Sequence, residues 1–200
     1  MARSPWWLPW AIYTPLGALG AALSFMSRGA VVTAPPGARF AATPWQATLL
    51  GVVAALVVTA VTVWSTRVLV AHAAWARRLH VTLRCALLGT PPARLAVLAG
   101  CAAVAEELFF RAALLPWLGV ALSSLVFGLL HVSPRATYLG WMLWASVMGV
   151  VFAWLFLWSG SLLPPIVAHA AINYGNMQYL VRFDPTEADS RAPRGRAPRL

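Results

Sequence analysis

Acidic residues are almost absent from the first 183 positions of this sequence, where the only two, Glu106 and Glu107, stand side by side. Around them the sequence is a series of long apolar stretches, several of about 20 residues, which is enough for an α-helix to cross a bilayer core. Of the 200 residues, 60% are hydrophobic and 10% are charged, whereas a soluble domain carries roughly a quarter charged residues. The mean hydropathy is +0.73. These features predict an all-α, polytopic membrane protein.

We expect about six transmembrane helices that enclose a polar site. Pro116 and Gly119 are expected to mark the end of the third. Residues 1–183 are predicted to form one integral membrane domain and residues 184–200 a disordered basic tail. The first stretch could instead be a secretory signal peptide, because small residues follow it. The apolar stretches cover approximately residues 6–26, 46–66, 93–115, 120–132, 138–158 and 164–180.

The basic residues predict the orientation in the membrane. All 15 are Arg, and the net charge is +10. Arginines favour cytoplasmic loops, so six spans place both termini in the cytoplasm and the basic tail against anionic lipid. The sequence therefore predicts a multi-pass protein of the cell membrane, with the bilayer and not nucleic acid as its charged partner. In this topology Arg28 and Arg39 fall outside, whereas Arg3, residues 67–94, Arg135 and the tail fall inside.

The connection between the second and third spans has a pattern of its own. Residues 71–88 are apolar with spaced arginines, a pattern typical of an amphipathic helix that lies in the membrane interface. Thr90, Pro91 and Pro92 then predict the start of the next helix, since proline is favoured in a first helical turn. We therefore expect an interfacial helix followed by the span that carries the acidic pair.

The acidic pair has a basic neighbour at helical spacing. Arg111 follows Glu107 by four residues, so the two side chains share one helix face and can form an ion pair. Glu106 is rotated from Glu107 by about 100°, and its carboxylate is left to point elsewhere. A charged group at membrane depth is costly and indicates function by default. The alternative is a buried charge cluster that only fixes helix packing.

Three further polar residues within apolar stretches could act with Glu106. They are His131, His169 and Asn173. A carboxylate can take a proton from water, a histidine can orient that water, and a second histidine with an amide can stabilise an oxyanion. Together these groups could hydrolyse an amide without a Ser or Cys nucleophile. Alternatively, Glu106, His131 and His169 could bind a catalytic zinc. A proton-coupled transporter would also use buried Glu and His residues.

The ordered motifs resemble a known family of membrane proteases. Glu106-Glu107-x-x-x-Arg111, Phe127-x-x-x-His131 and His169-x-x-x-Asn173 are similar to the signature of the CPBP family, the CAAX-protease and bacteriocin-processing proteins also called Abi. The resemblance implies an intramembrane endopeptidase with a protease core at about residues 93–180. Its substrate would be a membrane-associated protein or peptide. A catalytically inactive scaffold of the same fold is the alternative.

The resemblance also implies residue roles. Glu106 and His131 match the pair that activates water, and His169 and Asn173 match the oxyanion-stabilising pair. Supporting roles fall to Glu107, Arg111 and Phe127. We favour no cofactor, with zinc as the alternative. Family members look glutamate-dependent, although they are often labelled metalloproteases. The sequence contains no lysine and looks bacterial. The family name alone therefore does not establish that the substrate is prenylated.

The depth of the candidate residues sets a condition on the fold. Glu106 and His169 fall well inside their predicted spans, whereas His131 falls near the cytoplasmic end of a short stretch. We therefore expect them to meet only if the helices are tilted or broken, because irregular backbone at this depth must line a cavity or be buried in protein.

Overall fold

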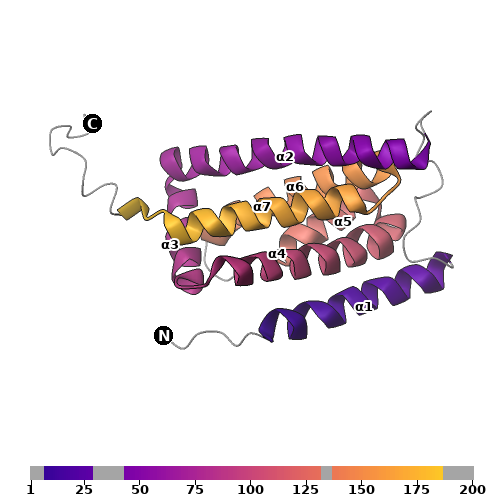
Figure 1. Ribbon diagram of the computed structural model, residues 1–200, viewed down its shortest axis with the longest axis horizontal. Coiled ribbons are helices and arrows are strands. Elements are labelled where there is room, and N and C mark those ends of the chain that lie inside the picture. The colour runs from indigo at the N-terminus through magenta and orange to yellow at the C-terminus, as the bar shows by residue number, and fades with distance from the viewer. Residues whose placement is uncertain (1–6, 29–42, 132–136, 187–200) are drawn as a thin grey trace.

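The computed structural model describes residues 7–28, 43–131 and 137–186, and these ranges are helical throughout apart from short turns (Figure 1). The predicted all-α fold is therefore confirmed for the described residues. Seven α-helices and one π-helical segment, η1, make up the bundle. They are α1 (Leu8–Arg28), α2 (Pro44–His72), α3 (Ala74–Leu87), α4 (Pro92–Glu107), η1 (Leu108–Leu114), α5 (Leu115–Leu129), α6 (Thr137–Ser159) and α7 (Leu163–Arg182).

Proline stands in the first turn of several of these helices. Pro44, Pro92 and Pro164 occupy this position in α2, α4 and α7, where the missing N–H costs no intrahelical hydrogen bond. At the start of α2, the Gln46 side chain also accepts a hydrogen bond of 3.0 Å from the backbone N–H of Thr43, the residue directly before the helix. The expected helix start after residue 90 is confirmed.

Within the described residues, three helical stretches are long and apolar enough to cross a membrane: Pro44–His72, Pro92–Leu129 and Tyr138–Ser159. Their outward faces carry large exposed apolar side chains, such as Leu56 and Val57 on α2, which are 54% and 60% exposed. A soluble protein rarely presents such a continuous apolar surface, and lipid accounts for it. The chain is therefore a membrane protein.

The run Pro92–Leu129 doubles back on itself at Gly119. This residue has φ 68° and ψ 176°, a backbone conformation that glycine adopts without steric cost. The rings of Phe110 and Phe127, on either side of the break, lie 5.0 Å apart, so α5 returns alongside η1. The expected break at Gly119 is confirmed, but Pro116 does not end the preceding helix, because helical winding continues through it.

The first helix packs closely against the segment that carries the acidic pair (Figure 1). A Cβ atom at Gly20 would lie 2.6 Å from the backbone nitrogen of Phe109, and one at Gly17 would lie 3.4 Å from the Cα of Ala105. Small residues of this kind let helix backbones approach each other in membranes. The first apolar stretch, for which a signal peptide is the alternative, is thus packed into the described bundle as α1.

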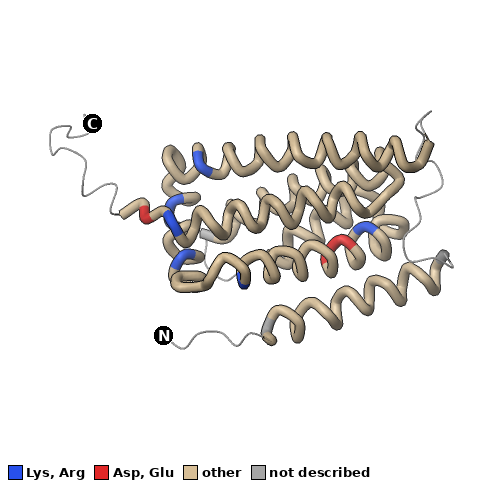
Figure 2. Tube along the Cα trace, in the orientation of Figure 1, with Lys and Arg blue, Asp and Glu red and all other residues tan. Residues whose placement is uncertain are grey.

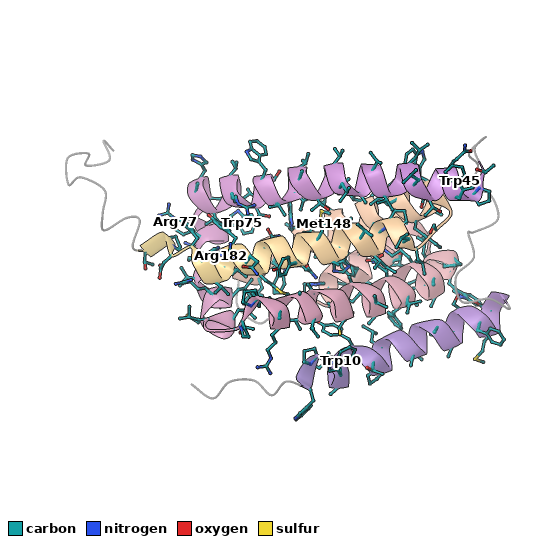
Figure 3. The ribbon with its side chains drawn as sticks, viewed as in Figure 1. Trp10, Trp45, Trp75, Arg77, Met148 and Arg182 are labelled. Carbon is teal, nitrogen blue, oxygen red and sulfur yellow. The ribbon has the colours of Figure 1, made fainter. Side chains whose placement is uncertain are left out.

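α7 lies at the centre of the bundle, with α2, α4, α3 and α6 around it. An apolar core joins α2, α6 and α7 through Ala55, Met148, Phe152 and Ala168, all at least 93% buried. Met148 lies midway along the bundle in Figure 3. This position buries His169 of α7 and partly buries Asn173, one turn further on.

Most of the described arginines gather at one end of the bundle, where α3 and the end of α7 meet (Figure 2). Trp75, Arg77 and Arg182 mark this end in Figure 3, and Trp45 marks the opposite end. The segment predicted as an interfacial helix, residues 71–88, contains the separate helix α3, which buries Ala76 and Leu79 and exposes Arg78. Its position in the membrane interface stays a prediction. Arg3, Arg39, Arg135 and residues 187–200 of the expected tail lie outside the described residues.

Candidate active site

The helix that carries the acidic pair changes its winding directly after it. α4 ends at Glu107, and the next seven residues form the π-helical segment η1. π-Helical turns are rare and occur frequently at functional sites. The segment carries Arg111 and buries it almost completely, with 2% of its surface exposed.

Glu107 and Arg111 form the ion pair that their spacing predicts. Arg111 Nε lies 3.1 Å from Glu107 Oε2, at ion-pair distance but without the alignment of a hydrogen bond. The guanidinium also donates a hydrogen bond of 3.1 Å through Nη2 to the carbonyl of Gly149 on α6. Because a buried charge needs partners, this network ties η1 to α6.

Aromatic rings enclose the Arg111 guanidinium. Its central carbon lies 4.7 Å from the ring centroid of Phe127 and 5.3 Å from that of Phe152. Such cation–π contacts are favourable when the cation is removed from water. The supporting position predicted for Phe127 is thus observed, while Phe152 was not singled out by the sequence because it lies in a uniformly apolar span.

His169 lies between the two carboxylates. Its Nδ1 is hydrogen bonded to Glu107 Oε1 at 2.8 Å, and its Nε2 lies 3.8 Å from Glu106 Oε2. The ring stacks on Phe152, with 4.9 Å between centroids and 17° between planes. The imidazole is therefore fixed in position and faces both members of the acidic pair.

Glu106 points away from the ion pair, as its rotation on the helix predicts. The side chain is 14% exposed, and its Oε2 atom is buried without a hydrogen-bond partner among the described residues. A separation of 3.8 Å from His169 is too long for a direct hydrogen bond, and such spacings are commonly bridged by water. Glu106 thus has the unpaired oxygen that a general base needs.

The reversal at Gly119 carries His131 back to the site. His131 follows the end of α5, and its Nδ1 donates a hydrogen bond of 2.8 Å to the carbonyl of Phe127. With the proton on Nδ1, Nε2 is left as an acceptor. The imidazole lies 5.0 Å from the Phe127 ring, and the centroid of that ring lies 6.0 Å from that of His169. The broken helix therefore brings His131 and His169 to the same phenylalanine ring.

Asn173 lies at the edge of this group. It follows His169 by one turn of α7 and lines a cavity of about 220 Å³ between α2, α3, α6 and α7. Trp141, whose ring centroid lies 5.1 Å from that of His131, lines the same cavity. Asn173 is thus placed beside the catalytic candidates but has no direct contact with Glu106 among the described interactions.

The segment that assembles this site matches a family model. Residues 89–175 match the family described as Type II CAAX prenyl endopeptidase Rce1-like, and this range includes every candidate residue from Glu106 to Asn173. The segment from residue 89 to residue 175 belongs to this CAAX-protease family. The family assigns the protein to the membrane enzymes of the protease class. No curated protein and no solved structure matches the chain.

The zinc set proposed for this CAAX-protease homologue is not assembled. Among residues 7–28, 43–131 and 137–186, no three His, Cys, Asp or Glu residues are placed to hold a metal ion. Nδ1 of His169 is engaged by Glu107 and Nδ1 of His131 by a carbonyl, which leaves Nε2 of both rings able to bind a ligand. Zinc therefore stays the alternative to a metal-free site.

A polar residue from outside the matched segment lies on the helix that packs against α4. This residue is Tyr13 of α1, one turn before Gly17, which packs on Ala105. A single tyrosine in an apolar stretch gives no signal by itself, and only the packing of α1 on α4 places it on this side of the bundle.

Proposed function

We propose that the protein is an intramembrane endopeptidase that hydrolyses a peptide bond of a membrane-associated protein or peptide. The observation that supports this best is the buried, unpartnered Oε2 of Glu106, 3.8 Å from His169 Nε2. The family match supports the same reaction class. Glu106 is the general base in this proposal, and His131 orients the water through its Nε2.

The hydrolysis requires no covalent enzyme intermediate. The water oxygen bonds to the carbonyl carbon while its proton passes to Glu106, and the carbonyl oxygen takes up the negative charge. His169 and Asn173 donate hydrogen bonds to that oxygen. The intermediate then collapses, the C–N bond breaks, and Glu106 returns the proton to the leaving amine. Product release restores the carboxylate for the next water.

Charge balance supports the role of His169. Glu106 and Glu107 carry two negative charges against the single positive charge of Arg111, and all three are at least 86% buried by side chain. Unbalanced buried charge is strongly unfavourable. His169 faces both carboxylates through its two ring nitrogens, so a proton shared within this group offsets the second negative charge, and Nε2 is the atom nearest to the proposed oxyanion.

The proposed setting is a bacterial cell membrane crossed about six times, with both termini in the cytoplasm. The arginines at the α3 end of the bundle (Figure 2) support this orientation, because arginine is enriched in cytoplasmic loops. The site then opens towards the cytoplasmic side, where α3 lies along the interface.

Purified protein in proteoliposomes tests this function directly. A panel of apolar membrane peptides is incubated with it in heavy-oxygen water, and products are identified by mass spectrometry. We expect cleavage that places one heavy oxygen on the new carboxyl terminus, and activity that survives a strong chelator. Activity that is lost in chelator and restored by zinc would overturn the metal-free mechanism. Absence of cleavage for the whole panel would contradict the proposal and favour the scaffold or transporter alternatives.

A further inference from the structure

A cavity beside the catalytic candidates has mostly apolar walls, whereas the candidate site itself is polar. It measures about 220 Å³ and lies between α2, α3, α6 and α7, at the arginine-rich end of the bundle. Sites for drug-sized ligands are roughly 300–1,000 Å³, so this cavity fits a part of a larger molecule. Its apolar walls include Trp75, Leu79, Leu83 and Leu87 of α3 with Trp141 and Trp144 of α6.

The cavity lies directly beside His131 and His169. Trp141 forms part of its wall and contacts the His131 ring at 5.1 Å between centroids. Asn173 lines it one turn from His169. A substrate with its scissile carbonyl at Glu106 would therefore place its neighbouring residue in this cavity.

Two amide side chains interrupt the apolar walls of the cavity, those of Asn173 and Asn176. A buried amide needs hydrogen-bond partners, and a peptide offers backbone N–H and C=O groups at nearly every residue. A hydrocarbon chain offers neither. The two amides therefore favour a peptide over a lipid tail as the occupant.

The α3 wall is held firmly in place. Trp75 packs directly on the backbone at Gly140 of α6. His80 Nε2 donates to the Phe183 carbonyl at 2.9 Å, and Arg84 donates to the Leu180 carbonyl at 2.9 Å. A wall fixed at both α6 and α7 can discriminate side chains by size, because a close-packed surface does not yield to an oversized group.

We infer that this cavity binds an apolar side chain of the peptide substrate next to the scissile bond, while the side-chain amide of Asn176 hydrogen bonds to the backbone of the same segment. The inference rests on the proposed endopeptidase function and adds its specificity site. The recognised class is an extended peptide with a medium-sized or large apolar residue at that position.

A peptide series tests the inference. The peptides are identical except at one position beside the cleaved bond, which holds alanine, leucine, phenylalanine or tryptophan. The wild type is expected to prefer leucine or phenylalanine. Leu83→Ala enlarges the cavity and shifts the preference towards tryptophan, whereas Ala76→Leu fills it and shifts the preference towards alanine. Asn176→Leu lowers kcat/KM about tenfold for every peptide, the loss of one hydrogen bond. Cys85→Ala, exposed on the same helix, is the control and retains the wild-type profile.

A binding measurement separates the inference from the function it rests on. The leucine peptide is made with a photoreactive apolar residue at the tested position and is cross-linked to wild type and to Glu106→Gln. Cross-links at Leu83 or Met177, which lines the same cavity, support the inference even if no peptide is cleaved. Cleavage with unchanged preferences in Leu83→Ala and Ala76→Leu, or cross-links only outside the cavity, overturns the inference and leaves the protease function standing. Absence of both cleavage and cavity cross-links overturns both.

Discussion

The Glu107 carboxylate and the His169 imidazole are joined by a buried hydrogen bond of 2.8 Å although 62 positions separate them in the chain. This bond connects α4 to α7 and leaves the other imidazole nitrogen facing Glu106. Glu107 thus holds both His169 and Arg111. In the proposed mechanism the two carboxylates have different roles, and Glu106 is the one that acts on water.

Removal of Arg111 should destabilise the fold. In Arg111→Ala, the fully buried Glu107 loses its guanidinium partner, and breaking a buried ion pair in this way costs about 3–5 kcal/mol. Thermal unfolding in detergent measures the loss. Arg78→Ala, an exposed position on α3, is the matched control and should unfold like wild type. An Arg111→Ala protein as stable as wild type would show that the pair has no structural role.

Asn173 should affect catalysis more than stability. Because Asn173 is the proposed oxyanion donor, removal of its side-chain amide is expected to lower kcat by about 10²- to 10³-fold with little change in KM. Steady-state kinetics of Asn173→Ala on one peptide checks this. If KM rises while kcat stays constant, Asn173 binds substrate in the ground state and does not stabilise the transition state.

The first helix should be required for activity although it lies outside the matched segment 89–175. A side chain at Gly20 would collide with the Phe109 backbone, so Gly20→Leu should separate α1 from η1 and lower stability by about 1–3 kcal/mol. We expect reduced cleavage with it. Ala18→Leu, at an exposed position of α1, is the control. Full activity in Gly20→Leu would show that α1 does not support the site.

The contact between α3 and α7 should weaken in acid. Burial lowers the pKa of His80 from 6.5, with Arg84 acting in the same direction and the Phe183 carbonyl and Asp184 opposing it. Because the pKa of His80 is lower in the folded than in the unfolded state, its stabilising contribution is present above the unfolded value and is lost as pH falls through the folded value. Melting temperature should therefore drop between about pH 7 and about pH 5.

The variant His80→Gln isolates this effect. Glutamine can still donate to the Phe183 carbonyl but does not titrate in this range, so its melting temperature should depend less on pH than that of wild type. An identical pH dependence in both proteins would assign the titration to another group.

Local spacing predicted the parts of the site that lie on one helix. The four-residue separation of Glu107 and Arg111 predicted their ion pair, and the rotation of Glu106 predicted its separate direction. The break at Gly119 was also readable, since glycine interrupts an apolar helix. These features depend on helix geometry alone, which the residue order specifies.

Contacts between helices could not be predicted in the same way. The bond from His169 to Glu107, the stacking on Phe152 and the position of Tyr13 depend on how α1, α4, α6 and α7 pack. An apolar span facing lipid and an apolar span facing protein have similar sequences, because no polar face distinguishes them. For the same reason, nothing in the sequence placed Asn173 and Asn176 on a common cavity.

Comparison of Glu106→Gln with Glu107→Gln tests the central claim most directly, with cleavage rate and melting temperature measured on both. We expect Glu106→Gln to lower kcat by about 10²- to 10⁴-fold while its melting temperature stays at the wild-type value. Glu107→Gln should lower the melting temperature, because Arg111 and His169 lose their charged partner. A Glu106→Gln protein that cleaves peptide at the wild-type rate would contradict the assignment of Glu106 as the base.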